Sequence, residues 1–312
     1  MKIAVIDDGI DKETAENGMH INCHYHYVNH KPEQGIRHGT KVVGIVEKYS
    51  SDTKEYEIYD VMNTKETSCS MAVTAALEDL LHHRVDVILM CLVIQNDKTF
   101  ERIRKLCHEL RERGSILIAS ASNSGDYSFP AVLDDVIGVG RMADRQSAVC
   151  WYEKEGIQLL GDVTPEFVKL GKEIRTVFSG TSKAAAVVAA MVSEQCNEGM
   201  KSYEQIQKMF QDRFPCKKGN MLEQVEHGEY RVDLQDKQMY KRISDVLKQM
   251  GYHLSGDESD CYFSRIARDT DEFAWLIPEI INRLDMPVVP EKMHYFDFIS
   301  VYALADYLGK YV

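Results

Sequence analysis

The first part of the chain alternates between continuous apolar runs and amphipathic segments. Four apolar runs are the expected strands, and they occupy residues 2–7, 85–94, 115–122 and 136–140. Their apolar side chains stand at consecutive positions rather than at alternate ones, which favours strands that are buried on both faces of a sheet.

Segments with helical spacing lie between these runs and after them. Residues 69–83 and 99–114 place apolar side chains three and four positions apart, and Gly114 is a typical helix stop. This alternation predicts an α/β fold with three layers and a mainly parallel sheet. In such a fold, reactive side chains are expected in the loops beyond the carboxyl ends of the strands.

The last part of the chain has a different pattern. Residues 215–236 are polar and irregular, and the residues after them are mostly helical in pattern. We therefore expect a large α/β domain over residues 1–235 and a small helical domain over residues 236–312.

Composition and charge narrow the range of functions. The 312 residues carry a formal net charge of −12, which argues against a partner that is a nucleic acid or an anionic membrane. No apolar run approaches the roughly 20 residues of a membrane-spanning helix. The eight cysteines are widely spaced in a chain without a secretion signal, so we expect mostly reduced thiols and a cytoplasmic protein.

Four polar residues occupy the junctions where chemistry is expected. Asp7 ends the first strand, His38 and Ser182 each open a helix of small residues, and Asn123 follows the third expected strand. A serine hydroxyl, an imidazole that takes its proton and a carboxylate that orients the imidazole together form a nucleophilic catalyst. The Asn123 amide and the backbone N–H of Ser182 could then stabilise an oxyanion.

Each of these residues also has a plain structural interpretation. Asp7 and Asn123 could be turn residues, His38 could simply begin a helix, and Ser182 could be a helix N-cap. Taken singly, these interpretations would be preferred for Asp7, His38 and Ser182. All of them would have to hold together while reproducing one catalytic set, so we favour the catalytic interpretation.

The order Asp, His, Ser, with the motifs DDG, HGT, SN and SGTS, resembles the subtilisin-like serine peptidases. The resemblance covers roughly residues 1–235 and implies that Asp7, His38 and Ser182 are the catalytic triad and that Asn123 serves the oxyanion. Asp8 stands where the family has a small polar residue. Lys183 departs from the family pattern too, and it adds a charge next to the nucleophile.

The family binds extended substrates along an edge strand. In the matching region of this chain, several residues differ from the family pattern. The expected substrate-binding residues are Cys91, Leu92, Val93 and Ile94, with Ser122 opposite them. Val93, Ile94 and Ser122 replace glycines of the family pattern. Their side chains should narrow the pocket for the residue before the cut, unless backbone shifts restore its width, and we expect a preference for glycine, alanine or serine there.

The resemblance also bears on the biological role. Met1 lies only six residues before Asp7, so we expect no folding prodomain; we also expect no cofactor and no calcium site. A restrictive peptidase of this kind suits the removal of a leader peptide from a ribosomally made peptide. The alternative is a catalytically silent scaffold that binds a peptide and acts through its helical domain.

Two weaker signals remain open. Residues 20–30 contain four histidines and a cysteine, and His24 and His26 would share one face of a strand. Such a pair could hold a metal ion such as zinc, but alternation with tyrosines is equally typical of an exposed strand, and no metal ligand is assigned.

The helical tail faintly resembles an acyl carrier domain. Asp271 stands in place of the carrier serine, so the resemblance implies no prosthetic group, and Pro278 is expected to interrupt the second helix. Such a module could serve as a docking surface for a protein partner. Phe273 and Trp275 are possible contacts, although core packing is favoured for both.

Overall fold

The structure is a computed structural model of the chain, and it divides into two compact units. The first comprises Met1–Val163, Leu170–Glu173 and Ser179–Leu222, and the second comprises Thr164–Lys169, Ile174–Phe178 and Glu223–Val312. The residues that the structure describes are 1–11, 19–28, 36–52, 54–64, 67–68, 70–94, 98–125, 128–143, 147–170, 174–200, 202–216, 237–254 and 261–312.

An eight-stranded sheet in the order β2-β3-β1-β6-β7-β8-β10-β9 forms the centre of the first unit. Every neighbouring pair is parallel except β9 and β10. The strands are β1 (Lys2–Asp7), β2 (Ile21–His26), β3 (Glu55–Asp60), β6 (Val87–Met90), β7 (Ile116–Ser120), β8 (Val136–Met142), β9 (Val149–Lys154) and β10 (Ile157–Asp162). The expected mainly parallel α/β fold is confirmed.

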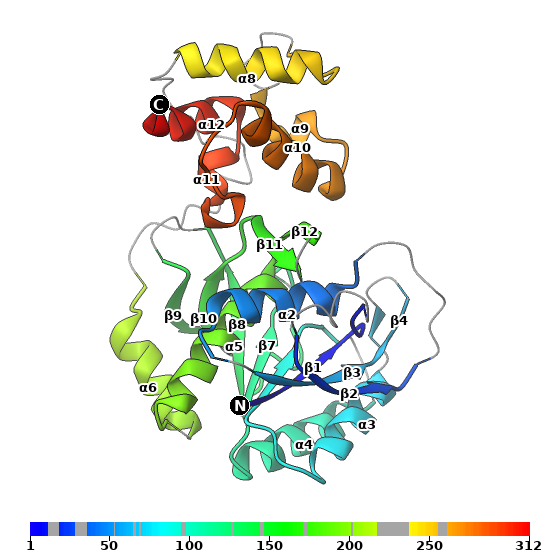
Figure 1. Cartoon of the computed structure of the whole chain (residues 1–312). Coiled ribbons are helices and arrows are strands. Elements are labelled where there is room, and N and C mark those ends of the chain that lie inside the picture. The colour runs from blue at the N-terminus through cyan, green and yellow to red at the C-terminus, as the bar shows by residue number, and fades with distance from the viewer. Residues whose placement is uncertain are drawn as a thin grey trace. The chain divides into compact units, whose positions relative to one another are not determined.

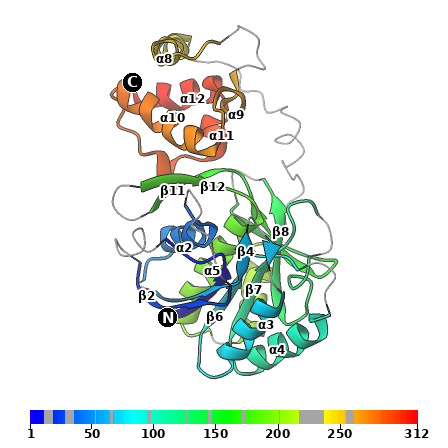
Figure 2. The ribbon, with the colours of Figure 1, turned by 90° about the vertical axis from the view of Figure 1, so that its right-hand side faces the viewer.

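Helices cover both faces of this sheet, as Figures 1 and 2 show. The helices α2 (His38–Tyr49) and α5 (Thr181–Asn197) pack against each other on one face. The helices α3 (Ser70–Leu80) and α4 (Phe100–Glu112) form a pair on the other face. A further helix, α6 (Tyr203–Arg213), contacts β9, and a small ribbon joins β4 (Met62–Thr64) to β5 (Thr67–Ser68).

The helix α5 is buried around nearly its whole first half. Its residues from Thr181 to Ala190 are buried except for Ser182, which is half-buried. A helix that is apolar on all sides belongs in a core. Small side chains let it approach the sheet closely, because a Cβ atom at Gly161 of β10 would lie only 2.6 Å from the Ala184 Cβ.

The second unit combines a two-stranded ribbon with short helices. The elements are β11 (Glu166–Leu170), β12 (Ile174–Phe178), α8 (Lys237–Gln249), α9 (Phe263–Ile266), α10 (Thr270–Arg283), α11 (Tyr295–Phe298) and α12 (Val301–Leu308), with 3-10 turns at Pro290–Lys292 and Gly309–Tyr311. Phe167 lies at ring-centroid distances of 4.9 Å from Phe298 and 6.4 Å from Phe273. These rings give the unit a core of its own.

One expectation about the helical tail was wrong. Pro278 does not interrupt its helix, because α10 continues through it from Thr270 to Arg283. The Asp269 side chain caps the start of the helix by accepting a hydrogen bond from the Glu272 N–H at 2.8 Å. Burial of one apolar face outweighs the hydrogen bond that the proline removes. Phe273 belongs to this buried face, whereas Trp275 is 52% exposed.

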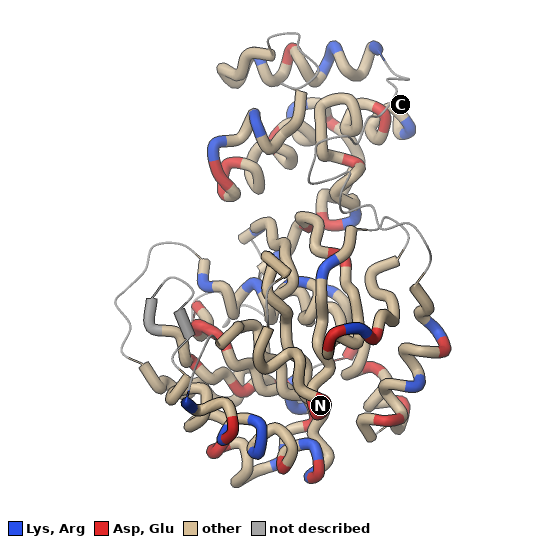
Figure 3. Tube along the Cα trace, turned by 180° about the vertical axis from the view of Figure 1, so that it is seen from behind, with Lys and Arg blue, Asp and Glu red and all other residues tan. Residues whose placement is uncertain are grey.

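Acidic and basic positions are both scattered along the trace in Figure 3. Cys150 and Cys216 form a disulfide, which the sequence pattern did not predict. The described cysteines that form no disulfide are Cys23, Cys91, Cys107, Cys196 and Cys261. Within the described part of the chain, no helix has the length and apolar character needed to cross a bilayer.

Candidate active site

Asp7 and His38 form a tightly coupled pair. Asp7 is the last residue of β1 and is fully buried, and His38 is the first residue of α2. The Nδ1 atom of His38 lies 2.8 Å from Oδ1 and 2.9 Å from Oδ2 of Asp7. Both carboxylate oxygens therefore favour a proton on Nδ1, which leaves Nε2 as the basic nitrogen of a neutral ring.

Asp8 joins the two elements that carry this pair. Its Oδ2 accepts a hydrogen bond from the backbone N–H of His38 at 2.9 Å, and its Oδ1 accepts one from Gly39 at 2.8 Å. These N–H groups belong to the unpaired first turn of α2, where a negative charge is also favoured by the helix dipole. Asp8 thus caps α2 from the loop that follows β1.

The charges of this loop change the proton affinity of both groups. Burial alone would lower the pKa of His38, but the charge of Asp7, the hydrogen bond to it and the charge of Asp8 together raise that pKa above its ordinary value. Burial, and then the charge of Asp7, raise the pKa of Asp8 to about 6. Close carboxylates in a partly buried loop produce such shifts.

Ser182 lies in the first turn of α5, after a sharp backbone turn. Gly180 has a φ of 88°, a conformation that favours glycine, and it directly precedes the helix. The Ser182 side chain is half-buried, while Lys183 is buried and its Nζ lies 2.7 Å from Oδ2 of Asp162. The additional charge next to Ser182 is therefore compensated by a carboxylate on β10.

Asn123 lies in the loop after β7 and is held by the residues that precede Ser182. Its Oδ1 accepts a hydrogen bond from the Thr181 N–H at 3.0 Å, and the Thr181 hydroxyl, which lies 3.2 Å from Oδ1, donates to the Ala121 carbonyl at 2.7 Å. The N–H donor identifies this amide atom as the oxygen, because the NH2 group of an amide is a donor. The NH2 group of this side chain is therefore the half that can donate to a ligand.

The expected substrate-binding residues follow β6 directly. Cys91, Leu92 and Ile94 are buried and Val93 is half-buried, and the Ile94 N–H donates to the Phe129 carbonyl at 2.9 Å. Leu92 and Ile94 belong to the core on the side of α3 and α4. Of these four residues, Val93 is the one with substantial exposure.

Two other residues of this region have identifiable contacts. The Cys91 Sγ lies 3.8 Å from the Ser182 carbonyl oxygen, and burial raises the pKa of the Cys91 thiol well above its usual value. The thiol therefore remains protonated and is no rival nucleophile. The Ser122 hydroxyl lies 2.6 Å from that of Ser124.

Topology explains why these segments occur in one region. β1, β6 and β7 are parallel neighbours, so Asp7 at the end of β1 and Cys91 and Asn123 after the other two strands lie at adjacent strand ends. The contacts of Thr181 and Cys91 link α5 to the loops after β7 and β6. An oriented imidazole, a hydroxyl at a helix start and an amide donor are the groups that acyl transfer requires.

Two functional candidates were missed or underestimated from sequence. Asp8 was recognised only as a departure from a family motif, although an acidic residue can cap a helix that starts far away in sequence. Asp162 gave no signal, because its partner Lys183 is 21 positions later.

Among the described residues, His24, His26 and Asp60 form the one group of three or more histidine, cysteine or carboxylate residues that could hold a metal ion.

Comparisons with known proteins agree with this architecture. The family model described as the subtilase family matches residues 1–211. No curated protein matches the chain. A solved structure described as a lanthipeptide protease is 16% identical with a TM-score of 0.51, and the match covers 67% of this chain and 78% of that one. The prenylagaramide maturation protease PagA is 19% identical with a TM-score of 0.48, over 67% and 80% of the two chains.

Proposed function

Because the chain belongs to the subtilase family, we propose that it is a serine endopeptidase that cleaves a specific peptide substrate. The observation that carries the proposal is the contact of His38 Nδ1 with both carboxylate oxygens of Asp7, at 2.8 and 2.9 Å. A buried carboxylate in this position holds the ring in the tautomer that can accept a proton at Nε2.

Each residue of the proposed set has a defined chemical part in the reaction. His38 removes the proton of the Ser182 hydroxyl as the oxygen attacks the scissile carbonyl, and it later gives that proton to the leaving amine. Asp7 orients His38 and stabilises its cationic form. The Asn123 amide and the Ser182 N–H donate hydrogen bonds to the developing oxyanion.

A fluorophosphonate probe tests the nucleophile without knowledge of the substrate. We expect covalent labelling of the wild type and its loss in Ser182→Ala. Ser179→Ala is a matched control, because Ser179 is an exposed serine three residues earlier, and it should label like the wild type. Equal labelling of wild type and Ser182→Ala would refute the assignment.

We further propose that the substrate pocket is narrow and lined by residues 91–94 and by Ser122. The half-buried side chain of Val93 supports this, since the family has glycine there. A peptide library should show cleavage after glycine, alanine or serine, and Val93→Gly should extend cleavage to larger residues. Efficient cleavage after phenylalanine or leucine by the wild type would contradict the narrow pocket.

The proposed biological role is leader-peptide removal during maturation of a ribosomally made peptide. The shared fold with a structure described as a lanthipeptide protease motivates this role. Incubation with candidate precursor peptides, followed by mass spectrometry, should yield two fragments from a single cut. Retention of an intact peptide, with no fragments, would instead support the silent peptide-binding scaffold.

We propose that residues 1–235 carry out catalysis and that residues 236–312 dock a peptide or protein partner. The exposed Trp275 supports a docking role, because large aromatic side chains are common binding anchors. A Trp275→Ala variant should cleave a short peptide normally and a full-length precursor less efficiently. Equal loss with both substrates would speak against docking.

A cytoplasmic location is part of the proposal. Five described cysteines that form no disulfide support it, whereas the Cys150–Cys216 bond is unusual for that compartment. Alkylation of thiols in intact cells, followed by peptide mass mapping, should find Cys150 and Cys216 alkylated. A protein recovered only from an extracytoplasmic fraction would overturn the proposed location.

A further inference from the structure

Strand β2 presents two histidines on one face. It is the edge strand of the sheet, and its side chains alternate between the two faces. Tyr25 and Tyr27 point to the α3 side, where their rings stack on Tyr59 at centroid distances of 4.9 and 6.2 Å. His24 and His26 therefore occupy the opposite face, with ring centroids 4.1 Å apart.

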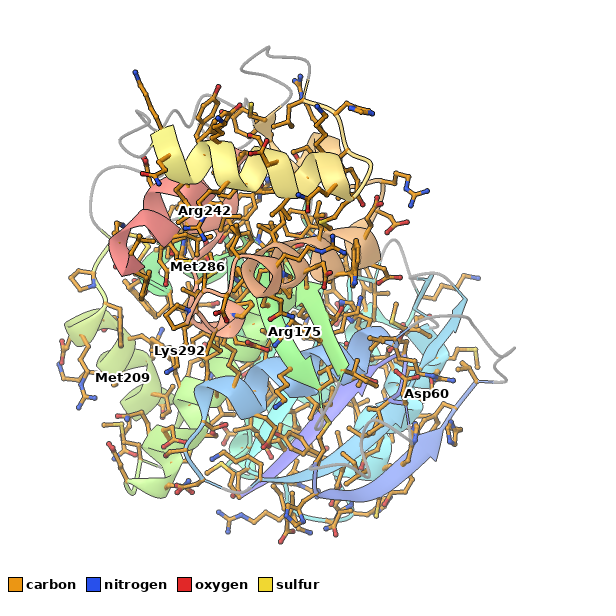
Figure 4. The ribbon with its side chains drawn as sticks, turned by 45° about the horizontal axis from the view of Figure 1, so that its top comes forward. Asp60, Arg175, Met209, Arg242, Met286 and Lys292 are labelled. Carbon is orange, nitrogen blue, oxygen red and sulfur yellow. A yellow bond between two sulfur atoms is a disulfide. The ribbon has the colours of Figure 1, made fainter. Side chains whose placement is uncertain are left out.

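A buried carboxylate completes the group. Asp60 ends the neighbouring strand β3 and is the register partner of His26. Its side chain is fully buried, and its Oδ2 lies 3.0 Å from Nδ1 of His26. One ligand atom from each of His24, His26 and Asp60 lies within 4.8 Å of the other two. Asp60 is labelled in Figure 4.

We propose that His24, His26 and Asp60 bind a divalent transition-metal ion, for which zinc is the best fit. Two imidazole nitrogens and one carboxylate oxygen form a set of three protein ligands that leaves a fourth tetrahedral position for water. Imidazole ligands favour zinc over calcium or magnesium, which prefer oxygen. The inference uses β2 and β3 and does not depend on the proposed peptidase function.

The positive charge next to the site is shared by two carboxylates. Arg37 is the basic residue at Asp60, with Nη1 3.3 Å from Oδ2, and its Nε also lies 4.0 Å from Oδ1 of Asp11. Asp11 and Asp60 thus supply two carboxylates to one guanidinium. A carboxylate has about four lone-pair positions, so Asp60 can accept from Arg37 and coordinate a metal ion at once.

Access and support for the ion are both present. The His26 side chain is 49% exposed, which gives an ion a route from solvent to the buried Asp60. Gly9 packs against the group, since a Cβ atom there would lie 2.9 Å from Asp60 Oδ2 and 3.0 Å from His24 Nε2. The ion would therefore brace the edge strand against the loop that follows β1.

Titration of the metal-free full-length chain with Zn2+ tests the site by calorimetry. We expect one equivalent to bind and the unfolding temperature to rise, because the folded state alone presents the ligands together. His24→Ala and His26→Ala should each bind Zn2+ at least about tenfold more weakly. His82→Ala and His253→Ala, which remove exposed histidines elsewhere, should bind like the wild type.

Substitution with Co2+ gives a readout of the ligands themselves. The wild type should show the visible d–d absorption of a four-coordinate Co2+ ion, and His26→Ala should lose it. His26 is half-exposed, so this variant is expected to remain folded, and circular dichroism would verify that. Unchanged Zn2+ affinity in both histidine variants, or a thiolate-to-cobalt band from cysteine ligands, would overturn the proposal.

Discussion

Asp8 contributes to the electrostatics of the candidate site together with Asp7. It accepts hydrogen bonds from the N–H groups of His38 and Gly39, and its charge contributes to the raised pKa of His38. A serine at this position would keep one acceptor and remove the charge. Asp8 therefore couples the helix cap to the protonation of the proposed base.

In Asp8→Ser, we expect the acidic limb of the pH profile of fluorophosphonate labelling to shift to lower pH. The base works as neutral imidazole, so reactivity falls as pH drops through the pKa of His38; removal of a nearby negative charge lowers that pKa. This shift is measured from the rate of fluorophosphonate labelling as a function of pH. Asp134→Ser, a remote exposed substitution, should leave the profile unchanged, and an unchanged profile in Asp8→Ser would contradict the coupling.

Lys183 and Asp162 form a buried ion pair next to Ser182, with 2.7 Å between Nζ and Oδ2. Lys183→Met leaves a carboxylate in a site built for a pair, and we expect a loss of about 3–5 kcal/mol in the free energy of unfolding. Urea denaturation measures this loss.

A matched double variant separates pairing from packing at this site. Lys183→Met combined with Asp162→Leu removes both charges, and it should recover most of the stability, because apolar replacement of a whole buried pair is often neutral. A single variant as stable as the wild type would show that the pair contributes nothing. A double variant that is less stable than the single one would assign the loss to packing.

At the scale of elements, continuous apolar runs were sufficient to predict β1, β7 and β8. The run at residues 85–94 was too long, because β6 ends at Met90 and the residues after it leave the ladder. Apolarity there reflects burial against α3 and α4 rather than strand pairing. An apolar run identifies a buried segment more reliably than it identifies its end.

Strand β3 was missed for a specific physical reason. Its sequence contains Glu55, Glu57 and Asp60, which break the apolar pattern. Glu57 is nevertheless buried, with Lys2 at 3.5 Å and His83 at 2.6 Å as partners from other elements. Asp60 likewise has its partners immediately before α2 and on β2 rather than nearby in sequence. Long-range partners of this kind are invisible in a local pattern.

The junction of α2 with the loop after β1 leads to a prediction about Gly39. A Cβ atom on Gly39 would overlap the carbonyl oxygen of Gly9. With a larger residue at position 39, the start of α2 could not lie this close to the loop after β1. Gly39→Ala should displace His38 from Asp7 and slow fluorophosphonate labelling by at least about tenfold, since small misplacements of catalytic groups are costly.

A control glycine distinguishes this close approach from a general effect of substitution in α2. Gly44 is also a buried residue of the same helix, five positions beyond Gly39 and so more than one turn from the junction. Gly44→Ala adds the same methyl group without altering the contact with Gly9, and it should label at close to the wild-type rate. Normal labelling of Gly39→Ala would show that the junction tolerates a side chain.

At the scale of the whole molecule, the sequence pattern led to a proposed catalytic set but not to the composition of the second unit. The residues Asp7, His38, Ser182 and Asn123 stand in motifs with a fixed order, so a family resemblance was enough to nominate them. The ribbon of β11 and β12 precedes Ser182 in sequence but groups with the helical segment. Its link to that segment is tertiary packing among the aromatic rings of Phe167, Phe273 and Phe298, which local pattern does not encode.

The Cys150–Cys216 disulfide closes a chain segment with a sequence separation of 66 that contains α5 and Ser182. Closing a loop of that length restricts the unfolded chain, and reduction should cost about 2–4 kcal/mol of the free energy of unfolding. Denaturation with and without dithiothreitol measures this cost. Cys216→Ser should unfold alike in both conditions and match the reduced wild type. A protein that operates in a reducing compartment has to remain folded after that loss, so unfolding of the reduced wild type at physiological temperature would contradict the proposed cytoplasmic location.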